Sequence, residues 1–184
     1  MPAPSADLIA AHEALYAAGR ISPFEHAPVT DRLRAGRNPL SEIDVLELVE
    51  LGITHVLDLR EESEWAAPGR VGRDAVESMA RHGLARTHIP LRDTAAPTGE
   101  RLTEAVTFVS ATLADPTARL YLHCRAGIER TGTVLLAWYA LSSNLSPTEA
   151  AAVLRQQYAR YHPLPHQHQA VEQWLRRRRA PGGR

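Results

Sequence analysis

Two residues of this sequence have the types and the spacing for nucleophilic chemistry on an anion. Cys124, the single cysteine of the chain, is followed six positions later by Arg130. Residues 120–132 predict a short strand, a tight loop and the first turn of a helix, which leaves backbone N–H groups unpaired at the positive end of the helix dipole. Gly127 lets the backbone approach an oxyanion closely, and the planar fork of Arg130 matches two phosphate oxygens. The segment therefore predicts a thiolate nucleophile that faces a tetrahedral oxyanion.

The motif His-Cys-x5-Arg-Thr-Gly in this segment resembles the signature loop of the cysteine-dependent protein tyrosine phosphatases. The short chain and the flanking segments look most like the dual-specificity branch, and the resemblance covers roughly residues 32–174. The alternative is that Cys124 is a buried structural cysteine on a core strand. The positions of the Cys, Arg, Gly and Thr-Gly residues favour the phosphatase interpretation.

The resemblance implies a role for each residue of the loop. Cys124 is the expected nucleophile that forms a phosphocysteine, and Thr131 matches the hydroxyl that helps the thiolate leave. His123 matches the histidine that orients the loop, although a lone histidine could equally be a satisfied core residue. The residues expected around the substrate phosphate are Arg125, Ala126, Gly127, Ile128, Glu129 and Arg130. Because Glu129 offsets Arg125, specificity for polyphosphoinositides is allowed but not supported.

Asp93 is the candidate general acid for the leaving oxygen. It follows the segment His-Ile-Pro-Leu-Arg, and in dual-specificity phosphatases a similar strand ends in the general-acid aspartate. The alternative is that Asp93 caps a turn, as most loop aspartates do. Asp58 competes for the role, but it lies inside a predicted buried strand, where a structural partnership with Arg60 is more natural.

Alternating strands and helices around these residues predict an α/β fold with a mainly parallel sheet covered on both faces, in a single domain like that of dual-specificity phosphatases. The expected strands are 33–36, 53–60, 86–91 and 119–123, those at 53–60 and 86–91 being buried. The expected helices are 5–18, 41–51, 73–82, 100–113, 130–141, 147–158 and 167–178. Ser41 and Ser146 begin two of them, with Asp44 and Glu149 in the capping-box position, and Ile43, Leu46 and Val49 are expected on the inner face of helix 41–51.

The polar residues that end three strands should meet at one edge of this sheet. Ligands of parallel sheets bind at the carboxyl ends of the strands. Arg60, the pair Arg92 and Asp93, and the pair His123 and Cys124 occupy those ends. This convergence follows without any assumption about the family.

The chain of 184 residues, 44% of them hydrophobic, is long enough for one globular domain with a sizeable core. We expect an N-terminal helical extension over residues 1–20, amphipathic and packed on the core, then a cysteine phosphatase domain over 21–179 and a disordered tail over 180–184. No signal peptide is expected at the N-terminus. A nucleophilic thiol needs a reducing compartment, so we expect a cytoplasmic protein.

The net charge and the positions of the histidines indicate which binding partners and metals to expect. The formal net charge is +0, so nucleic acid is not an expected partner, and no apolar run is long enough to span a membrane. The substrate is expected to be a phosphorylated protein or a small phosphate ester. His162, His166 and His168 are expected in a solvated loop without a metal, and the implied chemistry needs no cofactor. The arginines at 176–179 are expected to be the solvated end of the last helix.

Three function classes remain open from the sequence. The leading interpretation is a cysteine phosphatase of the protein tyrosine or dual-specificity type, which acts on phosphotyrosine and also on phosphoserine or phosphothreonine. The alternative is a phosphatase of small phosphate esters or phosphoinositides. A rhodanese-type sulfurtransferase is the second class, since Tyr-Leu-His-Cys-Arg-Ala-Gly is similar to its loop, but the six-residue step to Arg130 and the presence of Asp93 favour a phosphatase. A non-catalytic phosphoryl-binding module is the third, and such modules typically lose the nucleophile or the acid.

Overall fold

A five-stranded sheet forms the centre of the computed structural model, which describes residues 4–66 and 73–180. The strands are β1 His26–Pro28, β2 Leu33–Gly36, β3 His55–Asp58, β4 Ala85–His88 and β5 Leu120–His123, in the order β1-β2-β5-β3-β4. Strands β2, β5, β3 and β4 run parallel, and β1 pairs antiparallel with β2. The α/β fold with a mainly parallel sheet is therefore confirmed. β1 was not predicted, because it is short and ends in a proline, which a sheet accepts only at an edge.

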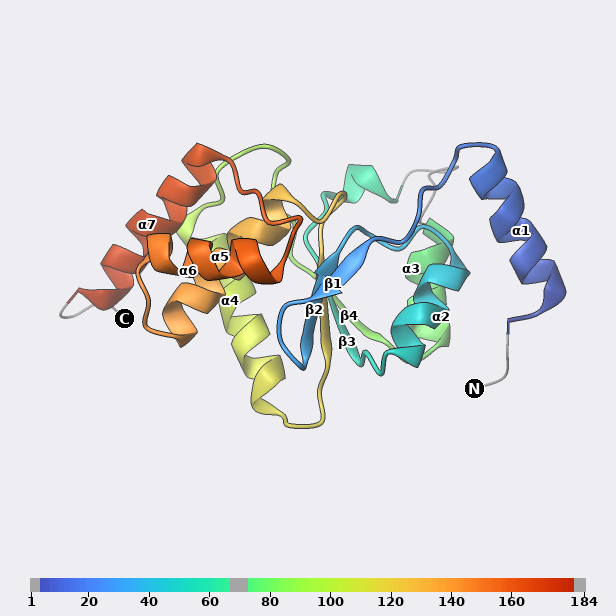
Figure 1. Cartoon of the computed structure of the whole chain (residues 1–184), viewed down its shortest axis with the longest axis horizontal. Coiled ribbons are helices and arrows are strands. Elements are labelled where there is room, and N and C mark those ends of the chain that lie inside the picture. The colour runs from blue at the N-terminus through green and yellow to red at the C-terminus, as the bar shows by residue number, and fades with distance from the viewer. Residues whose placement is uncertain (1–3, 67–72, 181–184) are drawn as a thin grey trace.

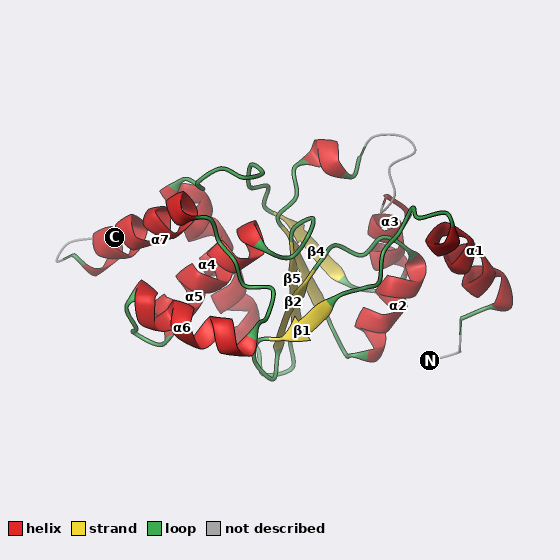
Figure 2. Cartoon of the chain, turned by 45° about the horizontal axis from the view of Figure 1, so that its top comes forward, coloured by secondary structure: helices red, strands yellow, loops and turns green. Residues whose placement is uncertain are grey.

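Helices cover both faces of this sheet (Figures 1 and 2). Helices α2 Glu42–Glu50 and α3 Arg73–Arg81 lie on one face. Helices α4 Gly99–Ala114, α5 Glu129–Ser142, α6 Pro147–Gln157 and α7 Pro165–Arg179 form the other layer. The larger core lies under this second layer, and a smaller one, which includes Val45, Val56, Met79 and Tyr121, lies under α2 and α3. β5, which leads into Cys124, is buried along its whole length between the two cores.

The burial of β4 and of α2 differs from the prediction. β4 lies at the edge of the sheet, and its residues are half-buried or exposed, so the expectation of a second fully buried strand is wrong. On α2 the buried apolar residues are Val45, Leu46 and Leu48, whereas Ile43 and Val49 are only partly buried. Asp44 lies on the buried face as well, where its carboxylate accepts hydrogen bonds from Arg37 and from the backbone N–H of Leu40.

The N-terminal helix α1 Ala6–Ala17 is confirmed, but it is not packed on the core. None of its residues is buried, and Ile9 and Tyr16 are 42% and 52% exposed. Its link to the domain is a hydrogen bond of 2.9 Å between His12 Nδ1 and Ser41 Oγ, the residue that caps α2. Figure 1 shows α1 standing at one end of the molecule, beyond α2 and α3. The division into an extension and a domain stays a prediction.

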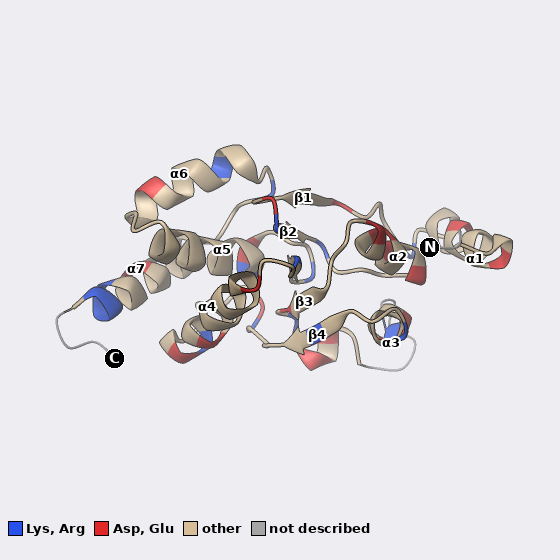
Figure 3. Ribbon diagram, turned by 90° about the horizontal axis from the view of Figure 1, so that it is seen from below, with Lys and Arg blue, Asp and Glu red and all other residues tan. Residues whose placement is uncertain are grey.

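The last helix begins at Pro165, earlier than predicted, and carries both His166 and His168. The expectation of a loop is wrong for these two residues, although His166 is exposed. His166 Nε2 donates to the carbonyl oxygen of Thr94, and His168 lies 3.5 Å from Glu172. The arginine run forms the end of α7, blue in Figure 3. Residues 181–184 of the predicted tail lie outside the described residues. Within the described part of the chain, no helix has both the length and the apolar character to cross a bilayer.

Candidate active site

The loop between β5 and α5 presents its backbone N–H groups to one pocket. Within the described chain, none of the N–H groups of residues 125–130 donates a hydrogen bond. The carbonyl groups are held from behind the loop: Asn38 N–H donates to Arg125 O at 3.1 Å, Arg160 Nη2 to Ala126 O at 2.8 Å, and the Tyr158 hydroxyl to Gly127 O. Because the carbonyls are fixed outward, the N–H dipoles converge on the inside and favour an anion there.

Two glycines make this loop geometry compatible with the sheet. Gly127 has φ +70°, and a Cβ at this position would meet the backbone carbonyl of Gly36 and, at 2.6 Å, the nitrogen of Arg37. Gly36, at the end of β2, is equally constrained, since its Cβ would lie 2.5 Å from Glu25 O and from the Tyr121 hydroxyl. The loop thus packs its backbone directly against the end of β2.

Replacing Gly127 by alanine is expected to lower both stability and activity. The left-handed conformation costs an L-residue about 1–2 kcal/mol, and the collision with Gly36 displaces the loop as well. Gly83→Ala is the matched control, because Gly83 has φ +75° but open space around it. We expect thermal unfolding to show a loss for both variants, larger for Gly127→Ala, and phosphatase assays to show a loss for Gly127→Ala alone. Equal unfolding temperatures and unimpaired activity in both variants would contradict this account.

Arg130, in the first turn of α5, is buried and held by two acidic side chains. Its Nη1 and Nη2 donate to the two carboxylate oxygens of Glu64 at 2.6 and 2.9 Å. Nη2 also lies 2.9 Å from Asp93 Oδ1, and Nη1 donates to Leu91 O. Burial opposes the charged forms, but these hydrogen bonds outweigh it, lowering the pKa of Glu64 and raising that of Arg130. Glu64 occupies the Nη1–Nη2 end of the guanidinium, and Asp93 lies at Nη2, while Nε has no hydrogen bond to any described residue. An anion could bind along the Nε–Nη2 edge once Asp93 moves away.

Replacing Glu64 by glutamine is expected to lower kcat/KM by about 10²-fold, because small displacements of an orienting group have large effects on rate. An amide offers one acceptor where the carboxylate offers two, so the guanidinium loses its fixed orientation. Glu62→Gln is the matched control, since Glu62 lies exposed on the same turn, η1 Glu62–Glu64. Steady-state assays with p-nitrophenyl phosphate measure both. Similar activity in the two variants would show that Glu64 does not orient Arg130.

Asp93 reaches the same pocket from the loop that follows β4. Its side chain is 48% exposed and lies against Arg130, and its backbone N–H donates to Glu61 Oε2 at 3.1 Å. The loop is also tied to α7: His166 donates to Thr94 O at 2.8 Å, and Gln167 Nε2 donates to Ala95 O at 3.1 Å. A cavity of about 150 Å³ is lined by Asp93, Thr94, Cys124, Arg125, Ala126, Ile128, Glu129 and Arg130. The candidate acid, nucleophile and phosphate-binding residues therefore share one small pocket.

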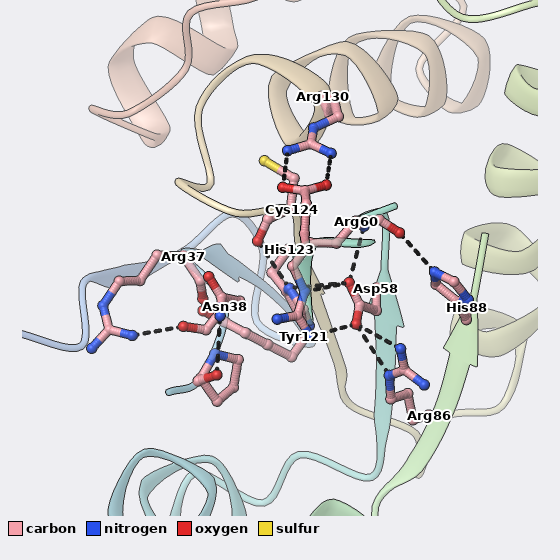
Figure 4. Close-up of polar contacts among 12 residues, drawn as sticks. Arg37, Asn38, Asp58, Arg60, Arg86, His88, Tyr121, His123, Cys124 and Arg130 are labelled. Carbon is pink, nitrogen blue, oxygen red and sulfur yellow. Dashed lines mark hydrogen bonds and ion pairs between the residues drawn. The ribbon is translucent and has the colours of Figure 1, made fainter. Parts of the chain in front are cut away.

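A buried ion network lies under Cys124 at the ends of β3 and β5, and Arg86 joins it from β4 (Figure 4). Asp58 accepts hydrogen bonds from Nε and Nη2 of both Arg60 and Arg86, at 2.7 to 3.1 Å. Burial opposes its ionisation, but His123, Arg60 and Arg86 hold the pKa of Asp58 well below its usual range. Asp58 is therefore a structural ion-pair partner of Arg60, as the sequence suggested, and it does not reach the pocket.

Two buried polar atoms beside the nucleophile lack partners among the described residues. His123 donates from Nδ1 to Cys124 O at 3.0 Å, which leaves its Nε2 unpaired. Burial lowers the pKa of His123 to about 4, so the imidazole is neutral at neutral pH. The Oγ1 atom of Thr131, one residue after Arg130, is also buried and unpaired. The side chain of Cys124 is 3% exposed. The structure thus places His123 beneath the loop and Thr131 at its end.

Sequence reasoning missed the residues that hold the loop from outside. Glu64 lies in a segment for which no role was predicted, although the segment follows β3 and therefore starts at the carboxyl edge of the sheet. Gly36, Tyr158 and Arg160 had no local signal, because their contacts with the loop join distant parts of the chain.

Comparisons with known proteins show the family and the fold of the chain. A family model described as a polymorphic toxin system DSP-PTPase phosphatase (Tc-R-P) matches residues 33–143. Three solved structures share the fold. The active form of Tk-PTP has a TM-score of 0.71 and 24% identity over 85% of this chain and 99% of its own. Kinase-associated phosphatase with its catalytic cysteine replaced by serine has a TM-score of 0.74 and 17% identity, over 87% of this chain and 98% of its own. PTPMT1 in complex with PI(5)P has a TM-score of 0.70 and 19% identity, over 82% of this chain and 94% of its own.

Proposed function

Because the chain belongs to the DSP-PTPase phosphatase family of polymorphic toxin systems and is a cysteine-dependent phosphatase, we propose that it hydrolyses phosphomonoesters through a phosphocysteine on Cys124. The observation that carries this assignment is the single pocket that Cys124, Arg130 and Asp93 line together. The unpaired N–H groups of residues 125–130 support it, since they face the place where the phosphoryl oxygens collect negative charge.

In the first step the Cys124 thiolate attacks phosphorus, forming the S–P bond as the P–O bond to the leaving group breaks. Arg130 and the loop N–H groups stabilise the equatorial oxygens, while Asp93 donates a proton to the leaving oxygen. The contact between Asp93 and Arg130 in the free enzyme has to open for this, because the phosphoryl group takes over the Nε–Nη2 edge of the guanidinium. Asp93 is then free to hold the proton.

In the second step water attacks the phosphocysteine, Asp93 accepts its proton, and the thiolate leaves. The unpaired hydroxyl of Thr131 is suited to donate a hydrogen bond to the departing sulfur. His123, neutral and bonded to Cys124 O, orients the loop and takes no part in proton transfer. We further propose that the reaction proceeds without a metal and in a reducing compartment such as the cytoplasm, where the thiol stays free.

We propose phosphotyrosine-containing proteins as the substrate class, with phosphoserine and phosphothreonine accepted, as in dual-specificity phosphatases. Small phosphate esters or phosphoinositides are the second candidate, favoured by a polar cavity beside the catalytic pocket. Turnover across phosphopeptides, inositol phosphates, phosphoinositides and nucleotides, with Cys124→Ser as the blank, decides between them. Thiosulfate turnover that exceeds phosphate ester turnover would favour a sulfurtransferase and overturn the proposal.

A further inference from the structure

A cavity of about 630 Å³ lies directly beside the catalytic pocket and shares Arg125 and Ala126 with it. The walls come from the segment before β1, the connection from β2 to α2, the turn η1, the signature loop and the connection from α6 to α7. The lining residues are Arg20, Ser22, Glu25, Arg37, Asn38, Leu40, Arg60, Ser63, Glu64, Arg125, Ala126 and Arg160. Figure 4 shows Arg37, Asn38 and Arg60 around the strand end that carries Cys124.

The lining is dominated by arginine, and the acidic residues do not balance it. Glu64 is committed to Arg130, and Glu25 to Arg160 at 2.6 Å. Arg20 and Arg125 are exposed, and neither side chain makes an ion pair or a hydrogen bond with a described residue. These two guanidinium groups therefore leave a surplus of positive charge at the cavity.

A third arginine of the lining keeps an unused donor in the interior. Arg60 is 1% exposed, and its Nε and Nη2 are bonded to Asp58. Its Nη1 is buried without a partner among the described residues. A buried, charged donor without an acceptor is unfavourable unless an anion compensates it.

We propose that this cavity is a subsite for a second phosphoryl group on the same small, polar substrate. The inference rests on the proposed function, whose scissile phosphoryl group fills the adjoining pocket of about 150 Å³. Guanidinium groups pair with phosphate oxygens through bidentate, charge-assisted hydrogen bonds, which suits Arg20 and Arg125. The cavity volume lies within the range of about 300–1,000 Å³ that is usual for small-molecule sites.

The lining favours a polyol or sugar framework over a peptide side chain. Leu40 and Ala126 are its apolar members, and none of the described residues that line it is aromatic. A phosphotyrosine ring would gain little from such a surface, because ring burial depends on apolar and aromatic contact. Hydroxyl groups of a polyol, in contrast, find acceptors and donors in Ser22, Asn38 and Ser63. A free polyol bisphosphate and a phosphorylated lipid headgroup both combine hydroxyl groups with a second phosphoryl group, so the lining suits either of them.

The test compares substrates that differ by one phosphoryl group. Glucose 6-phosphate and glucose 1,6-bisphosphate form the soluble pair. Phosphatidylinositol 5-phosphate and phosphatidylinositol 4,5-bisphosphate in phosphatidylcholine vesicles form the lipid pair. We expect kcat/KM to favour the bisphosphate by about tenfold or more in at least one pair, which is the size of one charge-assisted hydrogen bond. Preference in the soluble pair assigns a free bisphosphate, and preference in the lipid pair alone assigns a headgroup.

Three variants locate the effect in the cavity. Arg20→Gln should lower the bisphosphate preference severalfold, and Glu25→Gln should raise it, since Glu25 repels an incoming phosphate. Arg177→Gln is the matched control, because it removes one exposed arginine from α7, far from the cavity. All three should keep their turnover of p-nitrophenyl phosphate, which has no second phosphoryl group.

The proposal is overturned if neither pair shows a preference, or if Arg20→Gln and Glu25→Gln leave the preference unchanged. A preference for doubly over singly phosphorylated peptides, with none in the two small-substrate pairs, would overturn it as well. Failure of the proposed function looks different: hydrolysis of p-nitrophenyl phosphate would then persist in Cys124→Ser.

Discussion

Serine in place of Cys124 should reduce turnover of every phosphate ester by more than about 10⁴-fold, the scale seen when a catalytic nucleophile is removed. A hydroxyl at neutral pH is far less nucleophilic than a thiolate, and among the described residues no basic side chain is hydrogen-bonded to the side chain at this position. The oxygen is smaller than the sulfur and introduces no steric conflict, so the pocket and its N–H groups should persist. Rapid quench of the wild type followed by mass spectrometry should find the phosphoryl adduct on Cys124.

Anion binding provides the control for this variant. Cys124→Ser should still be stabilised by sulfate or vanadate in thermal unfolding, because the loop N–H groups and Arg130 supply the binding. Turnover above trace level in the serine variant would disprove the covalent mechanism. Loss of anion binding together with turnover would mean that the substitution damaged the loop, and the adduct in the wild type would then carry the assignment.

Replacing Asp93 by asparagine should slow hydrolysis of a phosphotyrosine peptide by about 10²–10⁴-fold, the usual contribution of general acid catalysis. The effect should depend on the leaving group, because tyrosine needs a proton as it departs and nitrophenolate needs it much less. The loss on p-nitrophenyl phosphate should therefore be smaller. The alkaline limb of the pH profile of kcat should flatten, since that limb reports the acid that must be protonated.

Asp115→Asn is the matched control for this prediction. Asp115 is a turn aspartate whose carboxylate accepts hydrogen bonds from Thr117 at the other end of α4, so its loss should not distinguish the two substrates. If Asp93 only caps its loop, Asp93→Asn should behave in the same way, with equal losses on both substrates and an unchanged alkaline limb. That result would remove Asp93 from the mechanism and return attention to Asp58.

The parts of the site that could be predicted are those that lie close together in the sequence or follow from strand direction. The spacing of Cys124 and Arg130 determines their relation across one loop, and the carboxyl ends of parallel strands meet whichever family the chain belongs to. The capping box at Ser146 and Glu149 formed as predicted, because both partners lie within one turn. At Ser41 the hydroxyl caps the helix, but Asp44 binds Arg37 instead of completing the box.

The remaining parts depend on packing between distant segments. Glu64 and Arg130 are 66 residues apart, and nothing in either neighbourhood selects the other. The pairing of Gly36 with Gly127 likewise depends on how closely the loop approaches the end of β2, which only the assembled sheet defines. Burial on α2 was predicted from apolar spacing alone, which gives no sign that the Asp44 carboxylate is buried on the same helix by partners outside it.

The attachment of the Asp93 loop to α7 also has a consequence for the order in which the enzyme becomes active during its synthesis. Gln167 is fully buried and joins Ala95 O to the hydroxyl of Thr133, while His166 holds Thr94 O from 72 residues further along the chain. A ribosome-bound chain that ends before residue 165 already contains the nucleophile, the phosphate loop and the acid. It lacks the helix that fixes the acid, so we expect such a nascent chain to bind phosphate before it can turn over an unactivated ester.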